Sequence, residues 1–275
     1  MRILRRTLLA AAALVAASAV ALALSVVVDR ARTDGRVEAL TNVVYDATDG
    51  GPDVAAHRAE PPGDGPHPAV VMIHEFWGLR ADVTGKADAL AERGYVVVAP
   101  DTFRGVSVDL VPSAIWNVVA TPAAAIDRDL RVVVDALAAD PSVDPERIVV
   151  MGFCYGGGAA LRYALSDDRL AGTGVFYGTP IDDPARLARL PGPVLGIFGE
   201  EDAQIPPREV AAFDAALDEA GVPHAIRSWP GVGHAFVGGV DAIAAGGPAG
   251  EAWATFVTWL EDVLGAPAPD AAGGA

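Results

Sequence analysis

The chain has 275 residues, of which 52% are hydrophobic and 20% are charged. This length and composition exclude a disordered protein and allow one large globular domain. The formal net charge of −16 repels phosphate backbones, so nucleic acid is not expected as a partner, and a single cysteine excludes an intramolecular disulfide and a cysteine-based zinc cluster.

The first segment, residues 1–29, has a basic start followed by an uncharged run from Leu8 to Val28. At about 1.5 Å per residue, a helix over this run is long enough to span a bilayer. We therefore expect an uncleaved membrane anchor over residues 8–28, with the basic start in the cytoplasm and the remainder outside it. The alternative is a cleaved signal peptide and a secreted protein, because small-x-small sites occur at Ala17-Ser-Ala19 and Ala21-Leu-Ala23.

The rest of the chain divides into three parts by composition. Residues 30–36 are predicted to be a polar linker, residues 37–264 a single domain, and residues 265–275 a disordered low-complexity tail. No second domain is expected, and the domain is expected to be a monomer.

Within the domain, strand-like and helix-like segments alternate. A hairpin around Asp49-Gly50 is predicted from Val37–Ala47 and Val54–Ala59. Further strands are predicted over residues 69–74, 95–99, 147–151, 171–177, 193–198 and 224–229. Helices are predicted over residues 81–93, 122–139 (with Thr121 as N-cap), 156–165, 207–220 and 250–264. This alternation predicts an α/β fold, a mostly parallel twisted sheet with helices on both faces and ligands at its carboxyl edge.

The segment Gly152-Phe-Cys154-Tyr-Gly156 follows a buried strand and opens a helix. It has the G-x-nucleophile-x-G pattern of the α/β-hydrolase elbow, with cysteine in place of serine. The positive end of the following helix is expected to favour the thiolate. A phosphate-binding loop is excluded because no lysine follows, and the glycine spacing does not fit a dinucleotide fingerprint. The alternative is a buried cysteine that only fills space.

A cysteine nucleophile needs a base and a group that orients the base. In this fold the acid and then the histidine follow the nucleophile along the chain. Asp202 lies in an acidic loop after the strand at 193–198, and His234 lies in a loop after the strand at 224–229. Asp202 is preferred to Glu200 and Glu201 because it lies deeper in its loop. A surface carboxylate and an exposed loop histidine are the alternatives.

Two backbone N–H groups are candidates for an oxyanion hole, those of Tyr155 and Phe76. Tyr155 follows the nucleophile, and Phe76 lies after the strand that ends near His74. The pair His74-Glu75 does not begin a zinc helix, because His-Glu-x-x-His fails at Gly78. We expect no metal and no cofactor.

The elbow, together with Gly199-Glu-Glu-Asp202, Gly233-His-Ala-Phe236 and Ile73-His-Glu-Phe-Trp-Gly78, resembles the dienelactone hydrolase (carboxymethylenebutenolidase) family over residues 40–264. The resemblance implies that Cys154 is the nucleophile, that His234 is the general base and that Asp202 orients it. It also implies that Glu75 matches the family's glutamate beside the nucleophile, which holds the resting thiol and modulates its ionisation.

The substrate-binding residues depart from the family pattern. Members that hydrolyse dienelactone hold its carboxylate with two arginines, and the position four residues after the histidine is Gly238 here. Arg104 lies near the other arginine, and Trp77 is a further candidate for substrate binding. The resemblance therefore implies a hydrolase of a small ester or lactone and puts dienelactone itself in question. Residues 106–122 are expected to form a lid or pocket wall, or to pack in the core.

Two other functions stay open on these residues. One is a hydrolase of thioesters or other acyl compounds. The second is a protein of the same fold that binds a ligand without catalysis.

Overall fold

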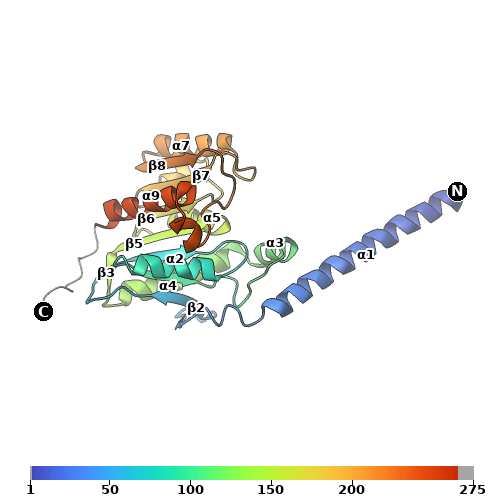
Figure 1. Ribbon diagram of the computed structural model, residues 1–275, viewed down its shortest axis with the longest axis horizontal. Coiled ribbons are helices and arrows are strands. Elements are labelled where there is room, and N and C mark those ends of the chain that lie inside the picture. Colours follow the sequence, from blue (N-terminus) through green and yellow to red (C-terminus); the bar gives the residue numbers. More distant parts are fainter. Residues whose placement is uncertain (1, 266–275) are drawn as a thin grey trace.

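A mixed sheet forms the centre of the molecule, which we describe from a computed structural model covering residues 2–265, without the side chains of residues 2–15 and 19 (Figure 1). In these residues the sheet is eight-stranded, with the order β1-β2-β4-β3-β5-β6-β7-β8. The strands are β1 (Val43–Tyr45), β2 (Val54–Ala59), β3 (His67–Ile73), β4 (Val96–Pro100), β5 (Val143–Phe153), β6 (Leu170–Phe176), β7 (Val194–Gly199) and β8 (His224–Trp229).

The six strands from β3 to β8 are parallel, because each pair of neighbours among them is parallel. The hairpin of β1 and β2 is antiparallel and joins the sheet by antiparallel pairing of β2 with β4. The predicted α/β fold with a mostly parallel sheet and an N-terminal hairpin is confirmed. The carboxyl ends of the parallel strands meet at one edge, where ligands bind in such folds.

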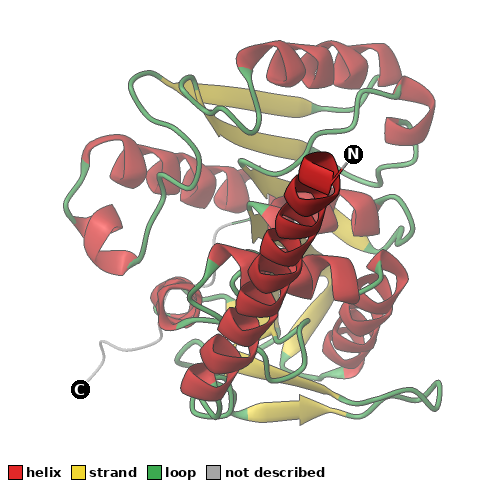
Figure 2. Cartoon of the chain, turned by 90° about the vertical axis from the view of Figure 1, so that its right-hand side faces the viewer, coloured by secondary structure: helices red, strands yellow, loops and turns green. Residues whose placement is uncertain are grey.

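Helices cover both faces of the sheet (Figures 1 and 2). The helices of the described residues are α1 (Arg2–Thr33), α2 (Ala81–Ala91), α3 (Val111–Ala120), α4 (Ala123–Ala139), α5 (Tyr155–Ala164), α6 (Pro184–Leu187), α7 (Pro207–Ala220), α8 (Val240–Ala244) and α9 (Gly247–Leu264), of which α1 does not cover the sheet. Alternate strand residues face opposite sides: Met72 packs in a cluster with α2 and α9, whereas Val71 packs in a cluster with α4 and α5. Strands buried on both faces explain the continuous apolar runs in the sequence.

Several predicted boundaries are wrong. The linker predicted over 30–36 begins inside a helix, because α1 continues to Thr33. The first strand of the hairpin is only Val43–Tyr45 rather than a strand from residue 37. Thr121 is not the N-cap of the next helix; Pro122 occupies that position and α4 begins at Ala123. Within 106–122 the chain forms α3, a helix that the sequence pattern did not predict.

The N-terminal helix α1 projects from the body of the domain, and its C-terminal part lies against α3 (Figure 1). Among residues whose side chains are described, no helix is both long and apolar enough to cross a bilayer. The anchor predicted over residues 8–28, part of which lies outside those residues, is therefore not supported. Apart from Gly265, the tail predicted as disordered lies outside the described residues.

Candidate active site

Cys154 lies on a sharp turn between β5 and α5. Its backbone has φ 53° and ψ −117°, a conformation that costs energy for any residue with a Cβ. The turn is held tightly, since an added Cβ at Gly152 would lie 2.3 Å from the carbonyl carbon of Gly156, and one at Gly156 would lie 2.4 Å from the oxygen of Ile73. Only glycine fits at these two positions, so the glycines of the motif are there to hold the strained cysteine in place.

The three side chains predicted as a triad come together at this turn. The Nε2 atom of His234 lies 2.9 Å from Sγ of Cys154, and its Nδ1 atom lies 2.7 Å from Oδ2 of Asp202. The carboxylate of Asp202 is fully buried. Its other oxygen accepts hydrogen bonds from the backbone N–H groups of Gln204 and Ile205, at 2.7 and 3.0 Å. Asp202 is thus fixed by its own loop and presents one oxygen to the imidazole.

Neighbouring parallel strands bring the two loops together. β7 and β8 pair up to their last residues, Gly199 and Trp229, so the loop with Asp202 and the loop with His234 leave the same edge of the sheet. A Cβ on Gly199 would lie 2.4 Å from the backbone oxygen of Val232. A side chain at position 199 would therefore push the histidine loop away.

A tyrosine packs against the ring of His234. The rings of Tyr177 and His234 meet edge to face, with their centroids 5.3 Å apart. The Tyr177 hydroxyl donates to the carbonyl of Val237 at 3.1 Å, which ties the histidine loop to the end of β6. The sequence pattern did not single out Tyr177, because a tyrosine after a buried strand is an ordinary core residue.

The resting sulfur is a thiol. Burial and the nearby Glu75 carboxylate raise the pKa of Cys154 to about 12, although the backbone N–H groups of Tyr155 and Phe76 lower it. The helix N-terminus favours the thiolate as predicted, since the Tyr155 N–H lowers the pKa of Cys154, but loss of solvation and like charge outweigh this effect. The same two N–H groups are those predicted for the oxyanion hole, and both act on the sulfur.

Glu75 is mostly buried beside the sulfur. Burial raises the pKa of Glu75, and the ammonium group of Lys86 is the strongest opposing influence. Lys86 is only 2% exposed. Its Nζ atom donates to the carbonyl of Gly238 at 3.0 Å and lies 4.1 Å from the ring centroid of Phe153. Burial lowers the pKa of Lys86, and the neighbouring Asp82 and Glu75 carboxylates oppose that shift.

Sequence reasoning missed Lys86, although two signals were present. It is the only lysine in the chain, and it lies on the buried face of α2 with Val83, Ala87 and Leu90. A lone lysine among apolar residues at helical spacing indicates a charge with a partner inside the fold.

The candidate substrate residues lie differently from the triad. Arg104 points its guanidinium at both carboxylate oxygens of Asp129, at 3.0 and 3.1 Å, so it is engaged away from the sulfur. The ring of Trp77 packs on Phe76 with centroids 4.4 Å apart, under the guanidinium of Arg80. Trp77 therefore lies beside Phe76, one of the two residues predicted to form the oxyanion hole. Among the described residues, no group of three or more His, Cys, Asp and Glu side chains is arranged to hold a metal ion.

The sequence profile of the dienelactone hydrolase family matches residues 54–264. The chain belongs to this family. A relative from Escherichia coli K12, provisionally named a carboxymethylenebutenolidase, is 28% identical over 230 residues, which cover 78% of this chain and 84% of the relative. A relative of the same name from Salmonella typhimurium is 30% identical over 201 residues, covering 68% and 74% of the two chains.

Solved structures agree with this membership. The crystal structure of a protein from Klebsiella pneumoniae, provisionally named a dienelactone hydrolase, is 28% identical with a TM-score of 0.69, covering 77% of this chain and 94% of that one. A metagenomic dienelactone hydrolase-like phosphotriesterase, 21% identical, shares the fold with a TM-score of 0.70 and coverage of 81% and 98%. The expected α/β-hydrolase fold of the dienelactone hydrolase type is confirmed.

Proposed function

We propose that the protein hydrolyses small carboxylic esters or lactones with Cys154 as the nucleophile. The observation that carries this proposal is the continuous chain of contacts from Asp202 through His234 to the sulfur, which lies on a strained elbow. Membership of the dienelactone hydrolase family supports the same reaction class. No cofactor is required for it.

The reaction begins from the neutral thiol. Nε2 of His234 takes the thiol proton as the sulfur attacks the carbonyl carbon of the ester, and a C–S bond forms. The negative charge that develops on the carbonyl oxygen is held by the backbone N–H groups of Phe76 and Tyr155. Asp202 stabilises the imidazolium and keeps the ring in the orientation that the transfer needs.

The second half of the reaction releases the acid. The imidazolium of His234 gives its proton to the leaving alkoxide oxygen, the C–O bond breaks, and a thioester remains on Cys154. His234 then takes a proton from a water molecule that attacks the thioester. The C–S bond breaks, the carboxylic acid leaves, and the proton returns to the sulfur.

Glu75 keeps the sulfur protonated until a substrate is present. Burial of the sulfur and, after it, the Glu75 carboxylate raise the pKa of Cys154, so an idle thiol resists alkylation and oxidation, which need the thiolate. Attack then depends on proton transfer to His234 during the reaction rather than on a stored thiolate.

The substrate is a neutral ester or lactone in this proposal. Gly238 has no side chain to bind a substrate carboxylate, and its carbonyl is bonded to Lys86. Arg104 is held by Asp129. With no arginine at position 238 and with Nη2 of Arg104 paired to Asp129, we expect no strong preference for a substrate that carries a carboxylate.

Hydrolysis of p-nitrophenyl acetate tests the proposal. The Cys154→Ala variant is expected to lose at least about 10³-fold in kcat/KM, in line with loss of a catalytic nucleophile. Ala is smaller than Cys at a position already fixed by glycines, and circular dichroism checks that the fold is kept. Equal rates for the two proteins would contradict the nucleophile, and no turnover of aryl esters, lactones or thioesters by the wild-type chain would favour a binding protein.

The location of the domain outside the cytoplasm stays a prediction. Cell fractionation with mass measurement of the mature chain tests it, since retention in the cytoplasmic fraction at full length would contradict it.

A further inference from the structure

Exposed apolar side chains are concentrated in one region of the molecule. All but two of the large exposed apolar side chains among the described residues lie in residues 20–28 or 110–119; the others are Val44 and Val240. On α3, Ile115, Trp116 and Val119 are 53%, 54% and 72% exposed, and their spacing places them on one side of the helix. A patch of this kind marks an interaction site.

Helix α3 is also uncharged, although the protein carries a net charge of −16. A helix that faces water normally carries polar or charged residues on its outer side. The outer side of α3 has apolar residues instead, so we expect it to contact an apolar surface rather than water.

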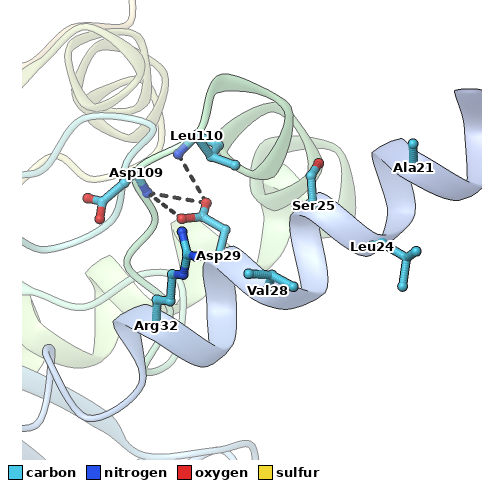
Figure 3. Close-up of a pocket in the computed structure, with 8 residues that line it drawn as sticks. All are labelled: Ala21, Leu24, Ser25, Val28, Asp29, Arg32, Asp109 and Leu110. Carbon is cyan, nitrogen blue, oxygen red and sulfur yellow. Dashed lines mark hydrogen bonds between the residues drawn. The ribbon is translucent and has the colours of Figure 1, made fainter.

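The end of α1 is fastened to the start of α3 (Figure 3). The Asp29 carboxylate, in a residue only 4% exposed, accepts hydrogen bonds from the N–H groups of Asp109 and Leu110, at 3.2 and 3.0 Å. Leu110 is the N-cap of α3 and has no side-chain cap of its own, so Asp29 supplies the anion there. Arg30 also donates to the side-chain oxygen of Asn117 at 2.7 Å.

These contacts make the two helices one surface. Trp116 and Pro112 form a groove of about 440 Å³ with Leu22, Val27 and their neighbours on α1. We call residues 20–28 together with Val111, Ile115, Trp116 and Val119 the apolar face.

We propose that the apolar face docks on the surface of a lipid bilayer. Within the uncharged run from Leu8 to Val28, the exposed apolar side chains among the described residues of α1 lie on more than one side of the helix, since Leu22 faces away from Val20 and Leu24. A protein partner covers one stripe of a helix, whereas the headgroup and acyl-chain boundary of a bilayer, about 5–10 Å deep, takes up apolar side chains from a wider arc of it. The apolar face continues this run onto a second helix, which is why lipid fits it better than a second copy of the chain.

The net charge of the protein determines which lipid headgroups allow docking of the apolar face. A net charge of −16 is repelled by anionic headgroups. Docking is therefore driven by burial of apolar side chains, so zwitterionic lipids are enough and added salt does not release the protein.

The apolar face adjoins the candidate active site. The loop that leads into α3 donates from the N–H of Val108 to the carbonyl of Trp77 at 2.9 Å. It packs so closely on Gly78 that an added Cβ there would meet the carbonyl of Val106. Docking would therefore hold the loop that carries Phe76 next to the lipid.

Flotation of the full chain with phosphatidylcholine vesicles tests the proposal. The double variant Ile115→Ser and Val119→Ser is expected to lower the vesicle partition coefficient at least about ten-fold. The matched control Val44→Ser, an equally exposed valine on β1 (60%), is expected to leave it unchanged. Binding of the wild type is expected to persist in about 0.5 M NaCl, at which charge attraction is largely screened.

Fluorescence locates the contact. Vesicles with brominated acyl chains are expected to quench part of the tryptophan emission, and the quenchable part is expected to disappear in Trp116→Phe. Equal partitioning of the double variant and the wild type, or quenching unchanged in Trp116→Phe, would overturn the proposal. So would release by salt, or a dimer in sedimentation that the double variant abolishes, since the latter would identify a second copy as the occupant.

Discussion

Replacement of Glu75 by glutamine tests how the resting thiol is controlled. Glutamine has nearly the same shape as glutamate but no charge, so it removes one of the three influences that raise the pKa of Cys154 to about 12, which are burial, the Glu75 carboxylate and the Asp202 carboxylate. The desolvation of the sulfur and the N–H groups of Phe76 and Tyr155 remain. The thiol pKa is therefore expected to fall in Glu75→Gln, and the thiolate to form at lower pH.

The expected rate of alkylation of the wild-type protein follows from the pKa of Cys154. At a pKa of about 12, roughly one thiol in 10⁴ is ionised at pH 8, against about a quarter for a free cysteine with a pKa of about 8.5. The more basic thiolate is roughly 25- to 55-fold more nucleophilic, for a Brønsted slope of about 0.4–0.5. Alkylation of the wild-type protein is thus expected to be roughly 40- to 100-fold slower than that of free cysteine. Each unit by which the pKa falls raises the rate about three-fold.

Iodoacetamide alkylation measured against pH is the assay, and labelling reports Cys154 alone because the chain has one cysteine. The rate is expected to rise with pH in the wild type without levelling off below about pH 11. In Glu75→Gln the curve is expected to shift to lower pH. Glu60→Gln is the matched control, because that side chain is 64% exposed and pairs with Arg58. A wild-type rate that is already level at pH 7, or identical curves for Glu75→Gln and the wild type, would refute the reasoning.

Three further substitutions test the site and its support. Asp202→Asn is expected to lower kcat about 10³- to 10⁴-fold on p-nitrophenyl acetate with little change in melting temperature, because the amide oxygen can still accept from its loop; a kcat within ten-fold of wild type would contradict this. Gly156→Ala places a Cβ 2.4 Å from a backbone oxygen and is expected to lower the free energy of unfolding in urea by about 2–3 kcal/mol. Gly158→Ala is the control, because its Cβ has its nearest contact at 3.4 Å, and it is expected to be tolerated. Equal losses of stability in the two variants would show that the close contact is not the cause. Asp29→Ala is expected to cost about 1 kcal/mol at pH 7. Burial alone would raise the pKa of Asp29, but hydrogen bonds hold it below its ordinary value. The stabilising contribution of Asp29 is therefore present at neutral pH and is lost as the pH falls through the lowered pKa. A stability difference between Asp29→Ala and wild type that is as large in strong acid as at pH 7 would contradict this.

The meeting of Cys154, Asp202 and His234 could be predicted because each follows a buried strand. Parallel strands send their carboxyl ends to one edge of the sheet, so three loops that follow three strands are brought together by topology alone. The strand register then fixes the loops relative to one another, since β7 and β8 pair up to Gly199 and Trp229. Residue type and position in the chain order were enough to identify these side chains.

The contacts around α3 could not be predicted in this way. Asp29 caps a helix 81 residues further along the chain, at Leu110, and nothing in the local pattern of either segment indicates the other. Hydrophobic periodicity predicts a helix on the assumption that its apolar residues face a core. In 106–122 the apolar residues of α3 are exposed, so this periodicity does not identify the helix. The helix was therefore missed, and the linker was placed where α1 still continues.

The ionisation of the sulfur shows why charge balance needs three-dimensional structure. A helix N-terminus contributes a partial charge that sequence can place, and by itself it favours the thiolate. Burial and a neighbouring carboxylate oppose it, and both depend on packing. Burial raises the pKa of Glu75, and the ammonium of Lys86, eleven positions along the chain, opposes that rise. The neutral thiol of Cys154 thus follows from a balance among groups on the turn between β5 and α5, on α2 and on the loop after β3, and removal of any one charge is expected to shift the pKa values of the others.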